Sequence, residues 1–241
     1  MMKGFQNYGF TLGTKTAKEL GIVMLSSSKR PILPQTVDRI LTIPGRHGAY
    51  DFGAELGPRL FELECALIAD TQADLQQTCR NLAAHLMDET GRPRLHQLRF
   101  DVEPDKYYNI RYAGSLPVER IASLGRFTLP LVAHDPFAYG DEQQASFVND
   151  AVTVKNAGTA ETYPRFSVTF TASASEWKVT LGTKFVRVVR NFTAGETLDV
   201  NCATGAIAVN GAPNISYLDW QNSEFFPLLP GNNILTIAPS G

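Results

Sequence analysis

The sequence predicts a mainly β protein in which a β-rich first domain with one α-helix is followed by an antiparallel β-sandwich. Apolar and polar residues alternate along many short segments, which is the period of a half-buried strand. One segment instead repeats its apolar residues at the spacing of a helix. The composition also changes along the chain, because residues 1–140 carry 16 basic and 15 acidic side chains whereas residues 141–241 carry only 6 and 9.

We predict the helix at about residues 70–88 of the first domain. Its apolar positions form a single stripe, made of Leu75, Cys79, Leu82, Ala83, Leu86 and Met87. Thr71 is placed to cap the first turn together with Asp74, three residues later. The sequence Gly91-Arg-Pro93 is a stop signal beyond the other end.

Strands with alternating apolar residues surround this helix, so the first domain is predicted to be a sheet with one helix laid across it. Their apolar members are Phe61, Leu63, Cys65 and Leu67, then Leu98, Phe100 and Val102, then Tyr108, Ile110 and Tyr112, and lastly Phe127, Leu129 and Leu131. Glu62 and Glu64 fall on the opposite face of the first strand. Two acids on one strand face are interpreted as solvated charges, because a glycosidase pair normally comes from different strands.

The second domain alternates more cleanly, and no helix is predicted there. Its inward-facing sets are Phe166, Val168 and Phe170, then Trp177, Val179 and Leu181, then Leu198, Val200 and Cys202. Asn210-Gly211 is a strong hairpin signal. Short strands at intervals of about ten residues are typical of a sandwich. We place the boundary between Gly140 and Phe147, which gives domains at residues 1–140 and 146–241.

Composition and charge argue against several classes of protein. With 44% hydrophobic and 19% charged residues, the chain can bury a core. No apolar run approaches the roughly 18 residues of a membrane-spanning helix, and the net charge of −2 argues against a general nucleic-acid binder. The amino terminus lacks the apolar segment of a secretory signal. Three cysteines cannot all pair within one chain, so we expect synthesis in a reducing cytoplasm.

Residue types that carry catalysis are present, but not in catalytic patterns. The histidines are His47, His85, His96 and His134, and their spacing does not match that of metal ligands. His85 is expected on the solvated side of the helix. No Gly-x-Ser-x-Gly turn occurs, and residues 101–105 (Asp-Val-Glu-Pro-Asp) resemble a turn rather than a calcium loop. We therefore expect no enzyme activity, no cofactor and no metal.

Two segments remain as candidate binding sites. Pro44-Gly-Arg-His-Gly-Ala-Tyr-Asp51 places glycines on both sides of Arg46 and His47, and exposed loops of this kind often carry function. Its spacing does not match a phosphate-binding loop. Tyr217 and Trp220 are candidates for an aromatic sugar platform, whereas Trp177 is predicted to pack inward.

Several short segments also occur in a familiar order. In the first domain these are Arg30-Pro31 through Pro34, residues 43–51 with their Gly-Arg-x-Gly loop, Arg59 leading into the strand at 60–68, and residues 127–139 with an Asp-Pro-Phe junction. In the second domain they are residues 154–159 with Pro164, residues 195–200, Asn210-Gly211 and residues 226–233. This order resembles the distal tail protein family of long-tailed, non-contractile (siphovirus-type) bacteriophages and prophages, along nearly the whole chain.

The resemblance implies a structural virion protein. In that family the first domains form a hexameric ring at the tail tip, which joins the tail tube to the adsorption apparatus or baseplate and leaves a channel for DNA. The second domains are galectin-like or carbohydrate-module-like sandwiches that dock receptor-binding proteins in some relatives. The implied partners are further copies of the chain, the tail tube protein and a tail-tip protein, without sequence-specific nucleic acid or membrane insertion. The implied location is the virion tail tip, after assembly in the bacterial host cytoplasm.

Three hypotheses remain open at this point, and the one ranked last is an unrecognised hydrolase that would need His47 or His134 together with distant carboxylates. In the first, Arg46, His47 and Tyr50 contribute to a ring or tube contact, since a closed ring needs two complementary surfaces on each subunit. In the second, the chain is a monomeric carbohydrate-binding β-sandwich protein in which Tyr217 and Trp220 hold the sugar.

Overall fold

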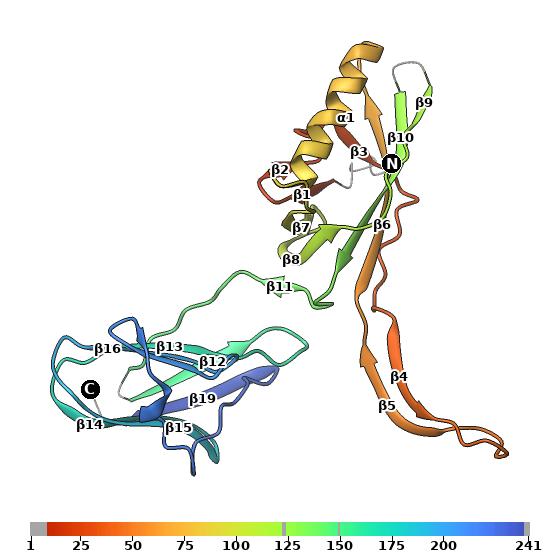
Figure 1. Cartoon of the computed structure of the whole chain (residues 1–241). Coiled ribbons are helices and arrows are strands. Elements are labelled where there is room, and N and C mark those ends of the chain that lie inside the picture. Colours follow the sequence, from red (N-terminus) through yellow and green to blue (C-terminus); the bar gives the residue numbers. More distant parts are fainter. Residues whose placement is uncertain (1–8, 122–123, 149, 239–241) are drawn as a thin grey trace, which may run out of the picture. The chain divides into compact units, whose positions relative to one another are not determined.

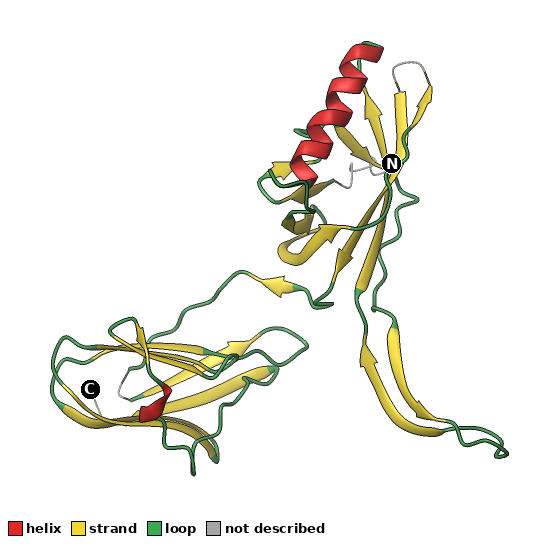
Figure 2. Cartoon of the chain, in the orientation of Figure 1, coloured by secondary structure: helices red, strands yellow, loops and turns green. Residues whose placement is uncertain are grey.

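The computed structural model describes residues 9–121, 124–148 and 150–238, and it is mainly β, with 51% of these residues in strands (Figures 1 and 2). The chain divides into two compact units, Met1–Glu142 and Gln143–Gly241, each with its own hydrophobic core. The predicted fold class is confirmed. Within the described residues, no helix has the length and apolar character needed to cross a membrane.

A nine-stranded antiparallel sheet forms the body of the first unit. Its strands follow the order β2-β1-β7-β8-β10-β6-β3, with β11 beside β8 and β9 beside β10. They are β1 (Phe10–Leu12), β2 (Lys15–Thr16), β3 (Ile22–Met24), β6 (Arg59–Ile68), β7 (Leu95–Phe100), β8 (Glu103–Tyr112), β9 (Glu119–Ile121), β10 (Leu124–Ala133) and β11 (Tyr139–Gly140). The β6–β10 pair is the longest, and the alternating residues predicted for it, Phe61 to Leu67 and Phe127 to Leu131, are buried in the core.

The predicted helix is confirmed as α1 (Gln72–Leu86), which packs Leu75, Leu82 and Leu86 onto the sheet's core. The Asp74 amide donates to Thr71 Oγ1 at 3.1 Å, so the predicted cap is also present. The helix ends before Gly91 because the chain turns back at once: Met87 forms a bridge with Pro93. An extended Met87 is incompatible with another helical turn.

The prediction that His85 is solvated is wrong. The residue is half-buried, its ring stacks on His96 with centroids 4.6 Å apart, and its Nε2 lies 2.9 Å from the carbonyl oxygen of Leu12. The physical reason is the β1–β2 hairpin, which was not predicted from the sequence and which covers this turn of the helix.

The second unit is a sandwich of two four-stranded antiparallel sheets, ordered β12-β19-β14-β15 and β13-β16-β17-β18. Its elements are β12 (Ala151–Asn156), β13 (Arg165–Thr169), β14 (Ala174–Leu181), β15 (Lys184–Phe192), β16 (Thr197–Asn201), β17 (Ala206–Val209), β18 (Ala212–Pro213), a 3₁₀ turn (Ile215–Tyr217) and β19 (Gly231–Ala238). Trp177 packs inward as predicted, with 2% of its surface exposed. Asn210 and Gly211, at φ +50° and +76°, make the predicted two-residue hairpin turn between β17 and β18.

Candidate interaction surfaces

A two-stranded arm leaves the first unit, built from β4 (Thr36–Leu41) and β5 (Tyr50–Leu56) (Figure 1). The two strands pair with each other and, among the described residues, with no further strand. Every residue in both strands is exposed. The arm and its turn nevertheless carry seven large apolar side chains that are between 42% and 69% exposed: Val37, Ile40, Leu41, Ile43, Tyr50, Phe52 and Leu56. Apolar surface concentrated in this way marks an interaction site.

The contacts within the arm are weak. Arg39 and Glu55 form an ion pair of 2.8 Å across the strands, but both side chains are more than 60% exposed, where such pairs contribute little. A two-stranded hairpin without a packed face is marginal in water. The arm therefore gains most if a second surface covers its apolar side chains.

The tip of the arm holds the three residues that the sequence put forward as interface candidates. The Arg46 guanidinium lies over the Tyr50 ring, 4.0 Å from its centroid, and His47 is exposed next to Arg46. Gly45 and Gly48 both have φ near +81°, which L side chains rarely adopt, so the glycines allow the turn. The loop anticipated from the sequence is thus the end of a long arm, and no pattern in the sequence predicts that arm.

At the base of the arm, one buried arginine joins three segments of backbone. Arg59 is only 9% exposed. Its Nη1 donates to the carbonyls of Pro31 and Ile32 at 3.0 and 3.1 Å, and its Nε donates to the carbonyl of Pro136 at 2.9 Å. The guanidinium also lies 5.1 Å from the Tyr108 ring centroid. Arg59 thereby ties the chain before the arm to the chain after the arm and to the segment after β10.

A signal for this role was present in the sequence. Arg59 is in phase with Phe61, Leu63 and the other inward-facing residues of β6, so it points to the buried side of the sheet. A charged side chain at an inward-facing position of a strand is buried only when it is well paired. The position of Arg59 in this alternation therefore indicates a buried, hydrogen-bonded arginine.

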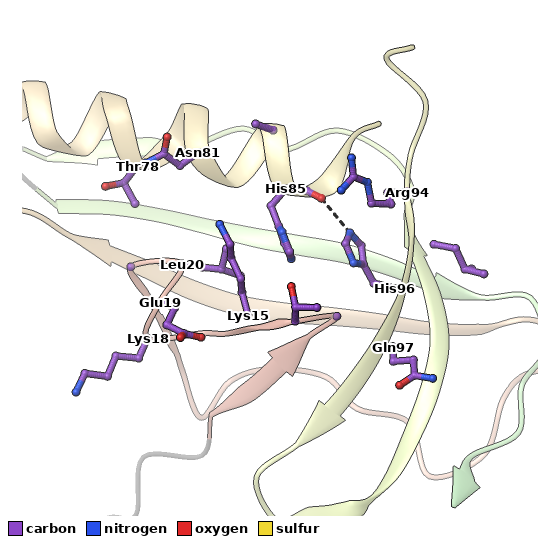
Figure 3. A pocket seen from close by; sticks show the side chains of 15 residues that line it. Lys15, Lys18, Glu19, Leu20, Thr78, Asn81, His85, Arg94, His96 and Gln97 are labelled. Atoms are coloured by element: carbon purple, nitrogen blue, oxygen red, sulfur yellow. Dashed lines mark hydrogen bonds between the residues drawn. The ribbon is translucent and has the colours of Figure 1, made fainter. Parts of the chain in front are cut away.

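A groove of about 900 Å³ lies between α1 and the β1–β2 hairpin of the same unit (Figure 3). Its lining includes Lys15, Lys18 and Arg94 together with the stacked pair His85 and His96. His96 Nε2 lies 2.9 Å from the carbonyl oxygen of His85, and burial lowers the pKa of His96 below its ordinary value. The groove is therefore positively charged through its lysines and arginine.

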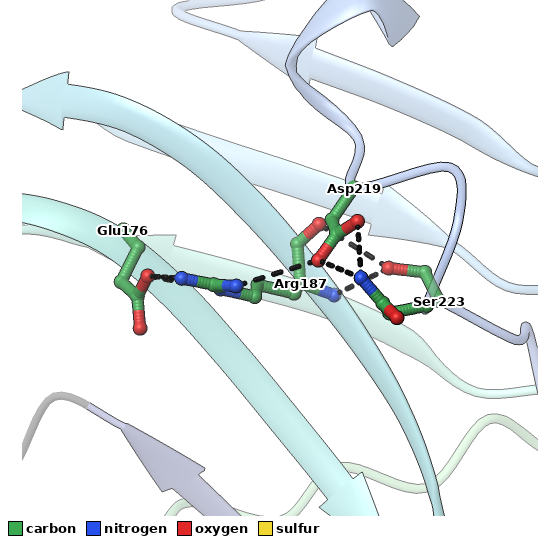
Figure 4. A network of polar contacts seen from close by, with 5 residues as sticks. Glu176, Arg187, Asp219 and Ser223 are labelled. Carbon is green, nitrogen blue, oxygen red and sulfur yellow. Dashed lines mark hydrogen bonds and ion pairs between the residues drawn. The ribbon is translucent and has the colours of Figure 1, made fainter.

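In the second unit, a polar network fixes the segment that follows the 3₁₀ turn (Figure 4). The Arg187 guanidinium donates to Glu176 through Nε at 2.9 Å and also through Nη2, and its Nη1 is 3.4 Å from Asp219. The Arg187 amide donates to Ser223 Oγ at 3.0 Å, and Asn222 donates to the Asp219 carboxylate. These bonds hold residues 218–224 along the edge of β15, where Val188 also bridges Leu218.

The two aromatic residues of the sugar hypothesis have different surroundings. Trp220 is 65% exposed. The Tyr217 ring is half-buried against the core, and the Arg190 guanidinium lies 5.4 Å from its centroid. Among the described residues, no ring contact joins Tyr217 to Trp220. One of the two rings is therefore already engaged within the unit.

Two of the three cysteines, Cys65 and Cys202, are buried in the cores of the two units. Burial raises the pKa of the Cys65 thiol to about 12 and that of the Cys202 thiol to about 11, so both remain protonated near neutral pH. The described residues contain no cluster of three or more histidine, cysteine or acidic side chains placed to hold a metal ion.

Both units match protein families of phage tails. The model described as "Phage tail protein RIFT-related domain" matches residues 15–133, and "Siphovirus-type tail component, C-terminal domain" matches residues 157–241. The chain belongs to the siphovirus-type distal tail protein family. The distal tail protein of Bacillus phage SPP1 is 28% identical over 198 residues, which are 80% of this chain and 76% of that protein.

Among solved structures, the crystal structure of the SPP1 Dit protein matches with a TM-score of 0.81 and 21% identity, over 98% of this chain and 96% of that one. That protein is described as a paradigm of the hub adsorption apparatus in phages that infect Gram-positive bacteria. The likeness extends across both units of the chain and supports its β-rich fold.

Proposed function

We propose that this distal tail family member is a structural hub of the virion tail tip, in which the first units of six copies close into a ring. The ring would join the tail tube to the adsorption apparatus or baseplate and leave a channel for DNA. The observation that carries the proposal is the β4–β5 arm, whose apolar side chains are exposed throughout.

The arm suits a ring for a physical reason. A closed ring is built from head-to-tail contacts, so each subunit presents one surface to the copy before it and a different one to the copy after it. An arm that projects from the sheet and has no apolar partner of its own is one such surface. Burial of Ile40 and Phe52 against a neighbour would remove from water two side chains that are 61% and 69% exposed. Arg46, His47 and Tyr50 would reach the contact first.

The proposed ring also implies partners other than further copies of the chain. The tail tube protein would lie on one side of the ring and a tail-tip protein on the other, and the second unit is the proposed docking domain for receptor-binding proteins. The role is structural rather than catalytic, in keeping with the names of the matched relatives. Synthesis in the bacterial cytoplasm and location at the virion tail tip belong to the same proposal.

The test is the solution mass of the purified chain by gel filtration with light scattering, and negative-stain images of the same peak. We expect a species of six chains, seen as an annulus. The arm variant is Ile40→Ser with Phe52→Ser, and its matched control is Ile234→Ser, because Ile234 on β19 is 64% exposed but lies outside the arm.

The arm variant should lose the annulus while the control keeps it. Arg46→Glu tests the tip alone, and we expect it to weaken assembly. If the arm variant and Arg46→Glu both assemble like the wild type, the arm is not the ring contact.

Sugar binding by the second unit is a separate proposal, favoured by the exposure of Trp220. A glycan array with the wild type and Trp220→Ala decides it. Binding that survives in Trp220→Ala, or no binding by either protein, would contradict a platform at this residue. Ring assembly and sugar binding are compatible, since different units would perform them.

A further inference from the structure

The lining of the groove between α1 and the β1–β2 hairpin carries more positive than negative side chains. Lys15, Lys18 and Arg94 form no ion pair within the described part of the chain. The acidic residue of the lining, Glu19, accepts hydrogen bonds of 2.8 Å from both the amide and the hydroxyl of Thr16. Those bonds hold the pKa of Glu19 below its usual value, so the lining contains one negative charge and three positive ones. Asp88, outside the lining, also interacts electrostatically with Arg94.

The positive charges are spread along the groove rather than gathered at one point. Figure 3 shows Lys15 extending toward α1, Arg94 beside His96, and Lys18 pointing away from the two histidines. A single small anion would be held best by donors that converge on it. A row of separated cations instead suits an extended segment that carries several carboxylates.

The same unit presents such a segment at the other end of the same pair of strands. Strands β1 and β7 are paired from Phe10 opposite Phe100 to Leu12 opposite Leu98. The groove lies beyond the Leu12 end of this ladder, and the turn that joins β7 to β8 lies beyond the Phe10 end, where the Asp101 amide donates to the Gly9 carbonyl at 3.1 Å.

The acidic turn is the segment 101–105, with the sequence Asp-Val-Glu-Pro-Asp, and all five of its residues are exposed. It consists of the two turn residues Asp101 and Val102 and the first three residues of β8. Asp105 is paired with the neighbouring Lys106 at 2.6 Å. Asp101 and Glu103 have no ion pair among the described residues. Between them, the side chain of Val102 is 45% exposed. One subunit therefore has a basic groove and an acidic turn at opposite ends of one strand ladder.

We propose that the acidic turn at residues 101–105 of one copy lies in the basic groove of the next copy. The inference rests on the proposed ring, and it names the pair of surfaces that repeats head-to-tail around it. Because the two surfaces differ and lie at opposite ends, the contact is heterologous, as ring closure requires. Complementary charge sets orientation and register more than affinity, so this contact would align subunits that the apolar arm holds together.

The first experiment joins amines to carboxylates with a carbodiimide in an equal mixture of unlabelled and ¹⁵N-labelled chain. Mass spectrometry of the mixed-isotope products identifies links between copies. We expect links from Lys15 or Lys18 to Asp101 or Glu103. Links between copies that lie only elsewhere overturn the contact and leave the ring intact. A chain that stays monomeric at millimolar concentration and low salt also overturns it, because charge pairing between copies needs no other protein.

The second experiment measures self-association by sedimentation for charge reversals. Lys15→Glu with Lys18→Glu should weaken association at least about tenfold at low salt, since like charges then face each other. Asp101→Lys with Glu103→Lys should do the same, and the combination of all four should restore it. Lys155→Glu is the matched control, because Lys155 is exposed on β12 of the second unit.

The outcomes separate this contact from the ring itself. Unchanged association in both reversals, with the Ile40→Ser and Phe52→Ser arm variant still defective, contradicts the groove contact alone. Restored association in the four-residue combination, with the arm variant unaffected, supports the contact and contradicts the arm. The Lys15→Glu and Lys18→Glu variant is also tested for binding to a short DNA duplex. If it loses affinity for the duplex while its self-association is unchanged, the groove binds phosphates and the proposal is overturned.

Discussion

Strands β5 and β6 are almost continuous in the chain, yet they have opposite surroundings. β5 ends at Leu56 and β6 begins at Arg59, and all seven residues of β5 are exposed whereas β6 alternates between buried and exposed. Each strand carries a phenylalanine near its start. Phe52 is 69% exposed, and Phe61 is 2% exposed.

The contrast shows that residue type alone does not decide burial. Phe61 is buried because β3, β10 and the core of the first unit surround its strand. Phe52 has the same side chain but only β4 beside it. If a neighbouring copy covers the arm, Phe52 becomes buried on assembly, as Phe61 already is within one chain. Folding and assembly then use the same hydrophobic effect at two successive steps.

The largest effect is expected where the side chain is already buried. Phe61→Ala removes a ring whose centroid lies 5.0 Å from that of Tyr108 and 5.9 Å from that of Phe100. A truncation of this kind costs about 3–5 kcal/mol, because it removes apolar contacts and leaves a cavity. Urea unfolding followed by hydrogen exchange in the first unit measures it. A loss below about 1 kcal/mol would mean that this part of the core is not closely packed.

A smaller loss is expected at the junction of the two strands. Arg59→Met keeps much of the side-chain length but removes the donors to Pro31, Ile32 and Pro136, and leaves their carbonyls to find other partners. We expect the free energy of unfolding of the first unit to fall by about 1–3 kcal/mol.

Hydrogen exchange distinguishes this effect from a general loss of stability. The amide of Phe137, which donates to Asp135 Oδ1, should exchange faster in Arg59→Met, while amides in the centre of β6 and β10 should follow only the global change. Uniform acceleration across the sheet would contradict a local role for Arg59 at the base of the arm.

The difference between β5 and β6 also explains which parts of the fold the sequence could predict. Strands with one buried face leave an alternating pattern, so β6, β10 and the sandwich strands β13, β14 and β16 were predicted correctly. The helix α1 was predicted from its stripe and its Thr71 cap. The arm leaves no such pattern, because neither of its faces is buried in one chain. The sequence contained Arg46 and Tyr50 but no signal that they end a long hairpin.

The prediction that His85 is solvated was wrong for a related reason. Helical periodicity placed His85 off the apolar stripe, which is correct for the helix by itself. What buries His85 is the β1–β2 hairpin, and β2 has only two residues, too few for a periodic signal. Contacts made by short, non-periodic segments have to be observed in a structure.

The next effect is a pH dependence of the stability of the first unit, which is expected for a histidine buried beside the sheet and not for one on the arm. Burial lowers the pKa of His96 below its ordinary 6.5, with further lowering from His85 and Arg94. The folded state therefore favours neutral His96. Its contribution to stability is present above the unfolded pKa near 6.5 and is lost as the pH falls through that value toward the folded pKa.

Urea unfolding of the first unit between pH 8 and pH 5 measures this contribution. His96→Gln should reduce the loss of stability at the acid end, whereas His47→Gln on the exposed tip of the arm should keep the wild-type pH profile, since it leaves the buried pair intact. An unchanged profile in His96→Gln would mean that His96 protonation is not linked to unfolding.

The smallest effect on stability is expected at Phe52, and it is the most informative result for the comparison. Phe52→Ala should change the free energy of unfolding by no more than about 0.5 kcal/mol, because the side chain makes few contacts that unfolding could break. The same substitution should weaken the six-chain assembly, as measured by light scattering, because it removes the phenyl group that the neighbouring copy is proposed to cover. A loss of stability approaching that of Phe61→Ala would show that Phe52 is already packed within one chain. Equal stability with undiminished assembly would show that the exposed face of β5 is covered by nothing. Only the combination of near-normal stability and impaired assembly fits an arm whose apolar residues are reserved for a second copy.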